Sequence, residues 1–329
     1  MNAKFEILEK KFGKISTLEL VNKTTNEYVT LIPQYGGLLH QVCLIHNHTL
    51  HNLLWSSQTY DDFIERDLTW YNGAMLSPFP DRIKDGRYTF ENIIYNLEKN
   101  EPGKKNALHG FLIGEPFIIN NKEANKDFVS VTLEHHYEGN KDGYPFPFIL
   151  FNKYTLNNEG VTICTVIKNI GTSAMPYGQG WHPYFCIDNA SKDFLIKVEA
   201  NYVHLVDENL IPTGEKISDT KFKGFVPLNY RNIKNKNMFF YCFELDRKQT
   251  ITKTVLRNKI KNLDIIIWQQ NLEKQYKFLQ LFTIDGIGGI AIEPLTCIPN
   301  GFNNQIGLLT LKPTESISMK FGIKLKKDV

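Results

Sequence analysis

Apolar and polar side chains alternate along several stretches of this chain, and this two-residue period constrains its fold more than any other feature. Near the C-terminus, Ile317, Met319, Phe321, Ile323 and Leu325 are separated by serine, lysine or glycine. Successive side chains of a β-strand point to opposite faces of a sheet. The segment is therefore predicted to be a strand with one buried face.

The same period recurs upstream, with turn signals between the predicted strands. Val129, Val131 and Leu133 share one face of a segment whose other face is polar. The apolar run Tyr154 to Leu156 and the run Val161 to Ile167 are separated by Asn-Asn-Glu-Gly. Two such runs joined by a short polar turn predict a β-hairpin.

Helical character is confined to one stretch, Ser56 to Arg66, with Ser56, Ser57 or Thr59 as candidate N-caps. Many strands at regular spacing with few helices are typical of a β-sandwich or barrel. We find no linker, low-complexity stretch or internal repeat, and 329 residues suit one large β domain. The sequence therefore predicts an all-β protein with a single domain over residues 1–329.

Charge and composition narrow the classes of partner. The 38 basic and 35 acidic residues give a net charge of +3, too balanced for a nucleic-acid-binding surface. No apolar run reaches the ~18 residues of a membrane span, and the charged segment Met1 to Lys11 lacks the apolar core of a secretory signal. We therefore expect a cytoplasmic protein without nucleic-acid or membrane partners, either a monomer or a homodimer.

The cysteines are odd in number, scattered, and include no Cys-x-x-Cys pair. We expect reduced thiols, most of them buried. The five residues are Cys43, Cys164, Cys186, Cys242 and Cys297.

His182 and Glu293 each stand directly before a proline. His182 lies in Gly-Trp-His-Pro-Tyr-Phe (180–185), and Glu293 follows an apolar, strand-like approach in Ile-Glu-Pro-Leu-Thr (292–296). A residue before proline is held in extended backbone, which fixes the direction of its side chain. An imidazole and a carboxylate held this way on a sheet suit an acid/base pair. The plainer alternatives are a histidine satisfied within an aromatic core and a carboxylate in a structural ion pair.

Two further polar side chains lie in loops flanked by apolar residues. Arg82 lies in Ser-Pro-Phe-Pro-Asp-Arg-Ile (77–83), where its guanidinium offers a fork of donors for hydroxyl or carboxylate oxygens. The alternative is a surface pair with Asp81. His109 precedes Gly110, and glycine permits a close approach of the backbone. The alternative there is an ordinary turn histidine.

The sequence gives little support for a metal or nucleotide site. His40, His46, His48 and His51 cluster within a dozen residues, yet no acidic or cysteine ligand accompanies them, so we expect no metal there. No P-loop, dinucleotide-binding glycine motif or Gly-x-Ser-x-Gly elbow is present. Nucleotide-binding and serine-hydrolase functions are thereby disfavoured.

Together, four motifs resemble the aldose 1-epimerase (galactose mutarotase) family in order and approximate spacing. They are Phe-Pro-Asp-Arg-Ile (79–83) with Asp-Gly-Arg-Tyr (85–88), Leu-His-Gly-Phe (108–111), His-Pro-Tyr-Phe (182–185), and Glu-Pro-Leu-Thr (293–296) with Pro-Asn-Gly-Phe-Asn (299–303). The resemblance covers nearly the whole chain.

The resemblance implies a large antiparallel β-sandwich with the sugar in an open cleft, and cofactor-free, metal-free interconversion of the α and β anomers of an aldohexose. It implies that Glu293 is the general base and His182 the general acid. Arg82 and His109 match positions that bind sugar hydroxyls, and Gln280 resembles a substrate-contacting glutamine.

The chain departs from the family pattern at two positions. Asp81 stands where an asparagine is often found, and a carboxylate accepts hydrogen bonds but cannot donate them. We keep Asp81 as a candidate sugar ligand, with a hydroxyl contact altered or lost relative to asparagine. The family's acidic sugar ligand falls in Asn235 to Phe240, which holds no aspartate; Asp246 and Asp264 are possible substitutes.

Three alternatives to a free-hexose epimerase remain. An enzyme acting on a hexose 6-phosphate requires extra cations, which Lys84, Arg87, Lys104 or Lys105 could supply. A non-catalytic sugar-binding protein has no need for a matched acid and base. Glycoside hydrolysis requires two carboxylates flanking the scissile bond, and the sequence offers one strong candidate.

Overall fold

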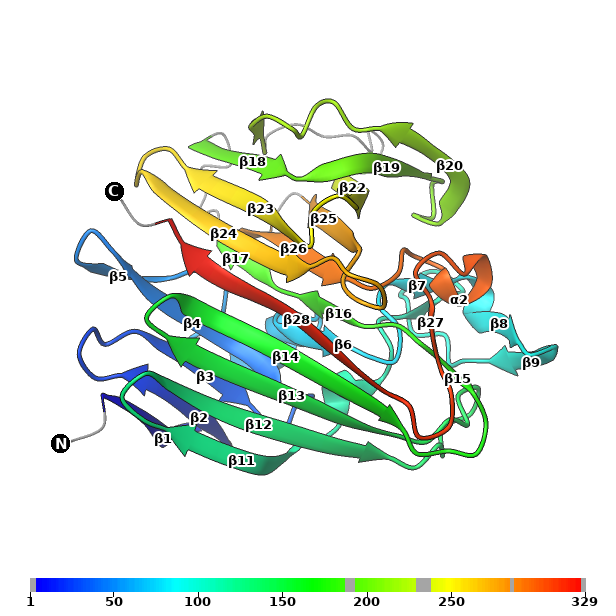
Figure 1. Cartoon of the computed structure of the whole chain (residues 1–329), viewed down its shortest axis with the longest axis horizontal. Helices are drawn as coiled ribbons and strands as arrows, with labels where there is room; N and C mark the ends of the chain where they lie inside the picture. Colours follow the sequence, from blue (N-terminus) through cyan, green and yellow to red (C-terminus); the bar gives the residue numbers. More distant parts are fainter. Residues whose placement is uncertain (1–3, 187–192, 229–237, 285–286, 327–329) are drawn as a thin grey trace.

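The structure, a computed structural model, describes residues 4–186, 193–228, 238–284 and 287–326. Within these ranges the strands form three large antiparallel sheets, which confirms the predicted all-β sandwich. We call them the front sheet, the site sheet and the N-terminal sheet. The front sheet crosses the view of Figure 1, with strands of the site sheet behind it. No helix in the described ranges is long and apolar enough to cross a membrane.

The front sheet contains the strands that the sequence predicts most clearly. The 154–167 hairpin is confirmed, with Asn158 and Glu159 forming its tight turn. The C-terminal strand buries Ile317, Met319 and Phe321, as its alternation predicts. In spatial order the strands are β11 (Ile118–Ala124), β12 (Phe128–Tyr137), β13 (Phe148–Asn157), β14 (Gly160–Asn169), β28 (Ser316–Leu325), β24 (Leu263–Gln270), β23 (Ile251–Asn258), β18 (Phe194–Val198) and β21 (Val226–Pro227).

The site sheet carries both candidate catalytic side chains on neighbouring strands. Glu293 lies on β26, and His182 ends β16. In order the strands are β20 (Pro212–Ser218), β19 (Ala200–Val206), β22 (Met238–Leu245), β25 (Phe278–Ile284), β26 (Gly289–Leu295), β16 (Gly180–His182) and β6 (Ala74–Leu76), with β17 (Tyr184–Cys186) also paired to β26.

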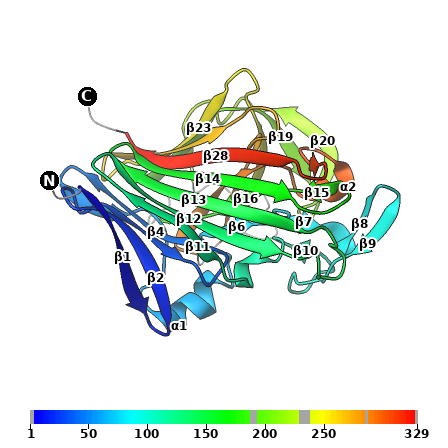
Figure 2. The ribbon, with the colours of Figure 1, turned by 60° about the horizontal axis from the view of Figure 1, so that its bottom comes forward.

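The N-terminal sheet and short ribbons complete the molecule. Figure 2 places the N-terminal sheet at one end and the β8–β9 hairpin at the other. The N-terminal sheet contains β1 (Phe5–Phe12), β2 (Ile15–Asn22), β3 (Tyr28–Ile32), β4 (Leu38–His46) and β5 (Thr49–Asn52). The ribbons pair β7 (Arg82–Ile83) with β10 (Ala107–Leu108), β8 (Arg87–Phe90) with β9 (Ile93–Asn96), and β15 (Met175–Tyr177) with β27 (Leu309–Leu311).

The predicted helix at Ser56 to Arg66 is confirmed only in part. A short α1 (Tyr60–Asp62) continues into a π-helical turn (Phe63–Asp67), and Thr59 is its N-cap, accepting from the backbone N–H of Asp62. Ser57 does not cap; its N–H and hydroxyl donate to Asp67. Other short turns are the 3₁₀ segments Lys84–Gly86 and Leu112–Gly114 and the helix α2 (Gly301–Asn304).

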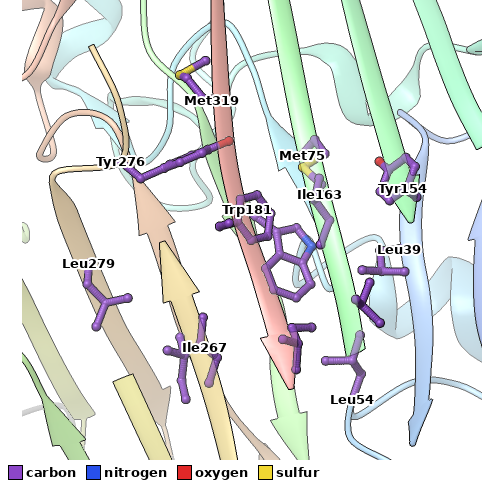
Figure 3. Packing of buried hydrophobic residues seen from close by; sticks show 14 of the residues in the cluster. Leu39, Leu54, Met75, Tyr154, Ile163, Trp181, Ile267, Tyr276, Leu279 and Met319 are labelled. Atoms are coloured by element: carbon purple, nitrogen blue, oxygen red, sulfur yellow. The ribbon is translucent and has the colours of Figure 1, made fainter. Parts of the chain in front are cut away.

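The core lies between the front sheet and the site sheet. Trp181 on β16 is fully buried and stacks on Phe321 of β28, with ring centroids 5.1 Å apart. Figure 3 shows its indole among Met75, Ile163 and neighbouring side chains. The indole Nε1 donates to the carbonyl of Gly73, so the ring is both packed and hydrogen-bonded. This anchoring fixes the backbone of β16 immediately before His182.

Two sequence expectations about cysteine and histidine can be compared with this structure. Cys43, Cys242 and Cys297 are buried, so the prediction of mostly buried cysteines is confirmed. The four clustered histidines do not converge, since the His40 ring contacts the Ser57 carbonyl while His46 lies beside His51. Among the described residues, no group of three or more His, Cys, Asp or Glu side chains is arranged to hold a metal.

Candidate active site

A cavity of about 550 Å³ lies against the site sheet. Sites for small molecules are typically ~300–1,000 Å³ in volume. Its wall combines polar groups with aromatic rings, which suits a sugar because sugars present both hydroxyls and apolar C–H faces. The lining includes Trp70, Tyr71, Arg82, His109, His182 and Gln280.

The register of the site sheet aligns a row of polar side chains beside the cavity. Gln280 on β25 lies directly opposite Glu293 on β26 and opposite Cys242 on β22. Residues paired across antiparallel strands point to the same face of a sheet. Two residues further along β25, Phe282 lies opposite Phe240 of β22, and both line the cavity. The sheet therefore presents a polar row and an aromatic row side by side.

His182 and Glu293 form a buried pair at the floor of the cavity. The distance between His182 Nε2 and Glu293 Oε1 is 3.6 Å, and Gln280 Nε2 donates to the same carboxyl oxygen at 3.3 Å. His182 and Gln280 line the cavity, and the fully buried Glu293 lies behind them. His182 Nδ1 and Glu293 Oε2 have no hydrogen-bond partner among the described residues. Each of these two side chains therefore has one polar atom without a hydrogen bond to another described residue.

Burial shifts the pKa values of the pair in opposite directions. It lowers the pKa of His182 to about 3. Burial, followed by the charge of Asp81, raises the pKa of Glu293 well above its ordinary value. The low-polarity surroundings thus favour a neutral imidazole and a carboxylic acid. The resemblance implied the other placement of the proton, a carboxylate base with an imidazolium acid, and these shifts oppose that placement in the unliganded protein.

This burial predicts a pH-dependent stability. An unfolded histidine titrates near pH 6.5, whereas folded His182 stays neutral down to about pH 3. The stability that His182 contributes is therefore complete above pH 6.5 and lost as the pH falls. Between pH 7.5 and 5.5, the wild type should lose about 1.4 kcal/mol more of its unfolding free energy than His182→Asn.

Denaturant unfolding of both proteins at the two pH values measures this difference. Glu293 acts in the opposite sense, because its raised pKa favours the fold at low pH and this contribution is lost as the pH rises. The comparison of the two proteins, rather than either profile alone, isolates the histidine. Equal losses in wild type and variant would show that His182 is not held neutral.

Arg82 is fixed between two carboxylates in the cavity wall. Its Nε donates to Glu101 Oε1 at 2.9 Å, and its Nη1 donates to Asp81 Oδ1 at 3.1 Å. Its carbonyl oxygen accepts from the backbone N–H of Asn300 at 2.6 Å, so the 299–303 motif supports this loop. The Asp81–Arg82 pair considered from the sequence exists, but it is buried beside the cavity rather than on the surface.

His109 is oriented by the backbone of Asp81. The Asp81 N–H donates to His109 Nδ1 at 3.1 Å, and the His109 N–H donates to the Asp81 carbonyl at 2.9 Å. A ring that accepts at Nδ1 carries its proton on Nε2, so His109 is a neutral donor. Burial also lowers its pKa well below the ordinary value. The close approach predicted at Gly110 is present, since a Cβ there would lie 2.1 Å from the Ser77 carbonyl oxygen.

The acidic candidates Asp81, Asp246 and Asp264 are not among the residues that line the cavity. Asp81 is fully buried behind Arg82 and faces its guanidinium. Asp264 pairs with Arg257 on the front sheet at 2.6 Å, and Asp246 accepts from Asn201. Residues 235–237 lie outside the described ranges, and Phe240 at the end of that stretch lines the cavity. Direct sugar contact by Asp81 therefore stays a prediction that its burial disfavours.

Several cavity residues escaped the sequence analysis. Glu101, which holds Arg82, directly precedes Pro102, the same feature that singled out His182 and Glu293. A search for ionisable residues directly before any proline would have included Glu101. Tyr71 packs on the ring of His109 with centroids 4.6 Å apart. Neither Tyr71 nor its neighbour Trp70 carries a sequence signal, because ordinary cores contain many such aromatics.

Comparison with known proteins is consistent with this architecture. A galactose mutarotase-like protein from Clostridium acetobutylicum superposes with a TM-score of 0.79 at 20% identity, over 99% of each chain. Galactose 1-epimerase from Lactobacillus acidophilus gives a TM-score of 0.78 at 19% identity, also over 99% of each chain. At these identities the likeness establishes the fold.

Sequence comparison assigns the chain to a family. The uncharacterized protein YihR of Escherichia coli is 29% identical over 255 residues, 76% of this chain and 78% of that protein. The aldose 1-epimerase of Streptococcus thermophilus is 25% identical over 216 residues, 63% of this chain and 59% of that one. The sequence model described as aldose 1-epimerase matches residues 18–324. The chain therefore belongs to the aldose 1-epimerase family.

Proposed function

We propose that this protein is an aldose 1-epimerase that interconverts the α and β anomers of a free aldohexose. One observation carries the proposal: the buried His182–Glu293 pair, 3.6 Å apart, lies at the floor of a cavity that Arg82 and His109 also line. Burying two ionisable groups without full hydrogen bonding costs free energy. Such groups are found mostly where they serve a function. Family membership supports the same reaction class.

The pair can carry out both proton transfers of anomerisation. Ring opening removes the proton of the anomeric hydroxyl, breaks the bond between C1 and the ring oxygen, and adds a proton to that oxygen. One group accepts while the other donates, so the pair keeps one proton throughout. Rotation about C1–C2 then exposes the other face of the aldehyde, and closure reverses the transfers. Each group is thus an acid in one half of the cycle and a base in the other.

The remaining polar groups hold the sugar while C1 turns. Arg82 has a guanidinium fixed by two carboxylates, and His109 has a fixed donor nitrogen. Hydroxyl groups that accept from such fixed donors are positioned at little entropic cost. Gln280 contacts Glu293 and lines the cavity, so it can orient the carboxyl group and meet the substrate.

A second candidate is an aldose that carries an anionic group, such as a hexose 6-phosphate. Lys84, Lys104 and Lys105 line a neighbouring cavity of about 230 Å³, together with Asp85 and Asp207. Lys104 Nζ lies 3.1 Å from the Glu101 oxygen that Arg82 also contacts, so the two cavities adjoin. Arg87, the fourth anticipated cation, is exposed on β8 and outside this lining.

Polarimetry of freshly dissolved α-D-glucose, α-D-galactose and α-D-glucose 6-phosphate distinguishes the candidates. We expect the protein to accelerate the change in rotation of at least one free hexose, and Glu293→Gln to abolish the effect. Acceleration of the phosphate alone would favour the second candidate. No acceleration by a folded sample, with sugar binding seen by calorimetry, would favour a non-catalytic sugar-binding protein.

A further inference from the structure

A second cavity, of about 790 Å³, adjoins the candidate active site and is not used by the proposed reaction. We call it the outer cavity. Tyr71 and Asn100 belong to the walls of both cavities. Asn100 Nδ2 donates to the Tyr71 hydroxyl at 3.4 Å, so these two side chains form a ridge between the cavities. Asn100 is exposed and Tyr71 is half-buried, so the ridge reaches the surface and a ligand can cross it.

Three rings lead from the catalytic pair to this ridge. The ring centroids of His182 and His109 are 5.0 Å apart, and those of His109 and Tyr71 are 4.6 Å apart. All three rings line the active-site cavity. A pyranose that places C1 at His182 and lies along His109 therefore has its far end at Tyr71. The ring atom opposite C1 in a pyranose is C4, so a substituent on O4 begins at the ridge.

The wall of the outer cavity combines an aromatic ring with polar side chains, as the wall of the active-site cavity does. Phe111 is half-buried, and its ring packs on Tyr137 with centroids 5.0 Å apart. The exposed side chains of Asn96, Glu98 and Asn100 add amide and carboxylate groups to the same wall. Amides and carboxylates bind hydroxyl groups, and an aromatic ring packs on the C–H face of a sugar. The lining therefore suits a second sugar ring.

The charges of the outer cavity favour a neutral occupant. Its wall includes the carboxylates of Glu98, Glu115 and Asp142 and the cation of Lys141. Lys141 Nζ lies 3.0 Å from Glu115 Oε1, so the positive charge is already paired. The remaining carboxylates repel an anionic group. A phosphate or carboxylate on the sugar is thus disfavoured here, in contrast to the lysine-lined cavity of about 230 Å³.

We propose that the outer cavity is a subsite for a neutral glycosyl unit, and that the protein epimerises the reducing end of a 1,4-linked disaccharide. This inference deepens the proposed function and rests on it. The reducing-end hexose lies at His182 and Glu293 with its anomeric hydroxyl free, and the second sugar crosses the Tyr71–Asn100 ridge. The glycosidic bond at O4 is neither formed nor broken, so the proton transfers are those of a free hexose.

Calorimetry of the wild-type protein with maltose, cellobiose and glucose tests the subsite. Both disaccharides have glucose as their reducing end, and they carry the second glucose on O4 in α and β linkage respectively. At least one of them should bind about tenfold more tightly than glucose, which one ring contact and one or two hydrogen bonds supply. Equal or weaker binding of both disaccharides would overturn the proposal.

Filling the outer cavity gives a second readout. Gly114 belongs to its wall, its φ is not positive, and a Cβ there would meet no atom within 4 Å. Gly114→Trp should therefore remove most of the roughly tenfold preference for the disaccharide over glucose, because the indole takes the place of the second sugar. Gly224→Trp, the same change at an open glycine outside both cavities, should keep the preference.

The remaining outcomes separate this inference from the proposed function. An unchanged preference in a folded Gly114→Trp would overturn the subsite; if that variant does not fold, the wild-type affinities still decide. Polarimetric acceleration of glucose without acceleration of either disaccharide would overturn the inference and leave the proposed function standing. A disaccharide preference that Gly114→Trp removes, in a protein that accelerates no sugar, would keep the subsite and reject only the proposed function.

Discussion

Replacing Glu293 with glutamine is expected to lower kcat by about a hundredfold or more, the usual contribution of a positioned acid/base group. The amide is nearly isosteric with the carboxyl, so Gln280 and His182 keep a neighbour of the same shape 3.3 and 3.6 Å away. What is lost is the exchangeable proton. Because Glu293 lies behind the cavity lining, KM should change much less than kcat. Polarimetric rates across a range of sugar concentrations separate the two constants.

His182→Asn should produce a loss of similar size, and the double variant should cost little more than either single one. Two groups that exchange protons with the sugar in one coupled step act as a unit, so their effects are not additive. Glu138→Gln, the same change at an exposed position, is the matched control and should behave as wild type. Wild-type turnover in Glu293→Gln, or fully additive losses in the double variant, would show that the pair does not share the chemistry.

Replacing Arg82 with alanine is expected to be the most destabilising single change at the site. It leaves Asp81, with an exposed side-chain fraction of 0%, and Glu101, with 7%, without their shared guanidinium. Removing one partner from a buried ion pair typically costs ~3–5 kcal/mol, because a buried charge is left uncompensated. Lys104 remains 3.1 Å from Glu101, so the larger part of the cost should fall on Asp81. Denaturant unfolding measures the loss.

Two further arginine variants separate charge from shape. Arg82→Lys restores a cation but not the planar fork, so stability should recover in part while KM for the sugar stays raised. Arg87→Ala removes an exposed arginine on the adjoining ribbon and should change stability by no more than ~0.5 kcal/mol. Full wild-type stability and KM in Arg82→Ala would contradict both the buried pairing and the sugar-binding role.

The strands could be predicted because their signal is local. Alternation along 316–325 depends only on residues two apart, and it matches the buried and exposed faces of β28. The predicted helix was wrong in extent for a non-local reason. Ser57 donates to Asp67 rather than capping a helix, and that contact depends on how the segment closes on itself. Propensity alone does not determine such a closure.

The candidate site was predictable where a single residue carried its own constraint. His182 and Glu293 were identified from the prolines that follow them, and Arg82 and His109 from their loops and their resemblance to the family. The prediction for Gln280 rested on the resemblance alone, because the residue is placed at the site by its pairing with Glu293 on the neighbouring strand. Tyr71 packs on His109, and this contact between residues far apart in the chain cannot be predicted from the sequence.

The strand-rich fold, the family and the candidate site residues could be predicted from the sequence, because each prediction depends on side-chain identity at short spacing. The surroundings of these residues come from the tertiary structure. Burial lowers the pKa of His182, and burial followed by the charge of Asp81, more than two hundred residues earlier in the chain, raises the pKa of Glu293. Burial and electrostatic fields depend on distances in space, so only the folded protein removes His182 and Glu293 from water and brings Asp81 within reach of Glu293.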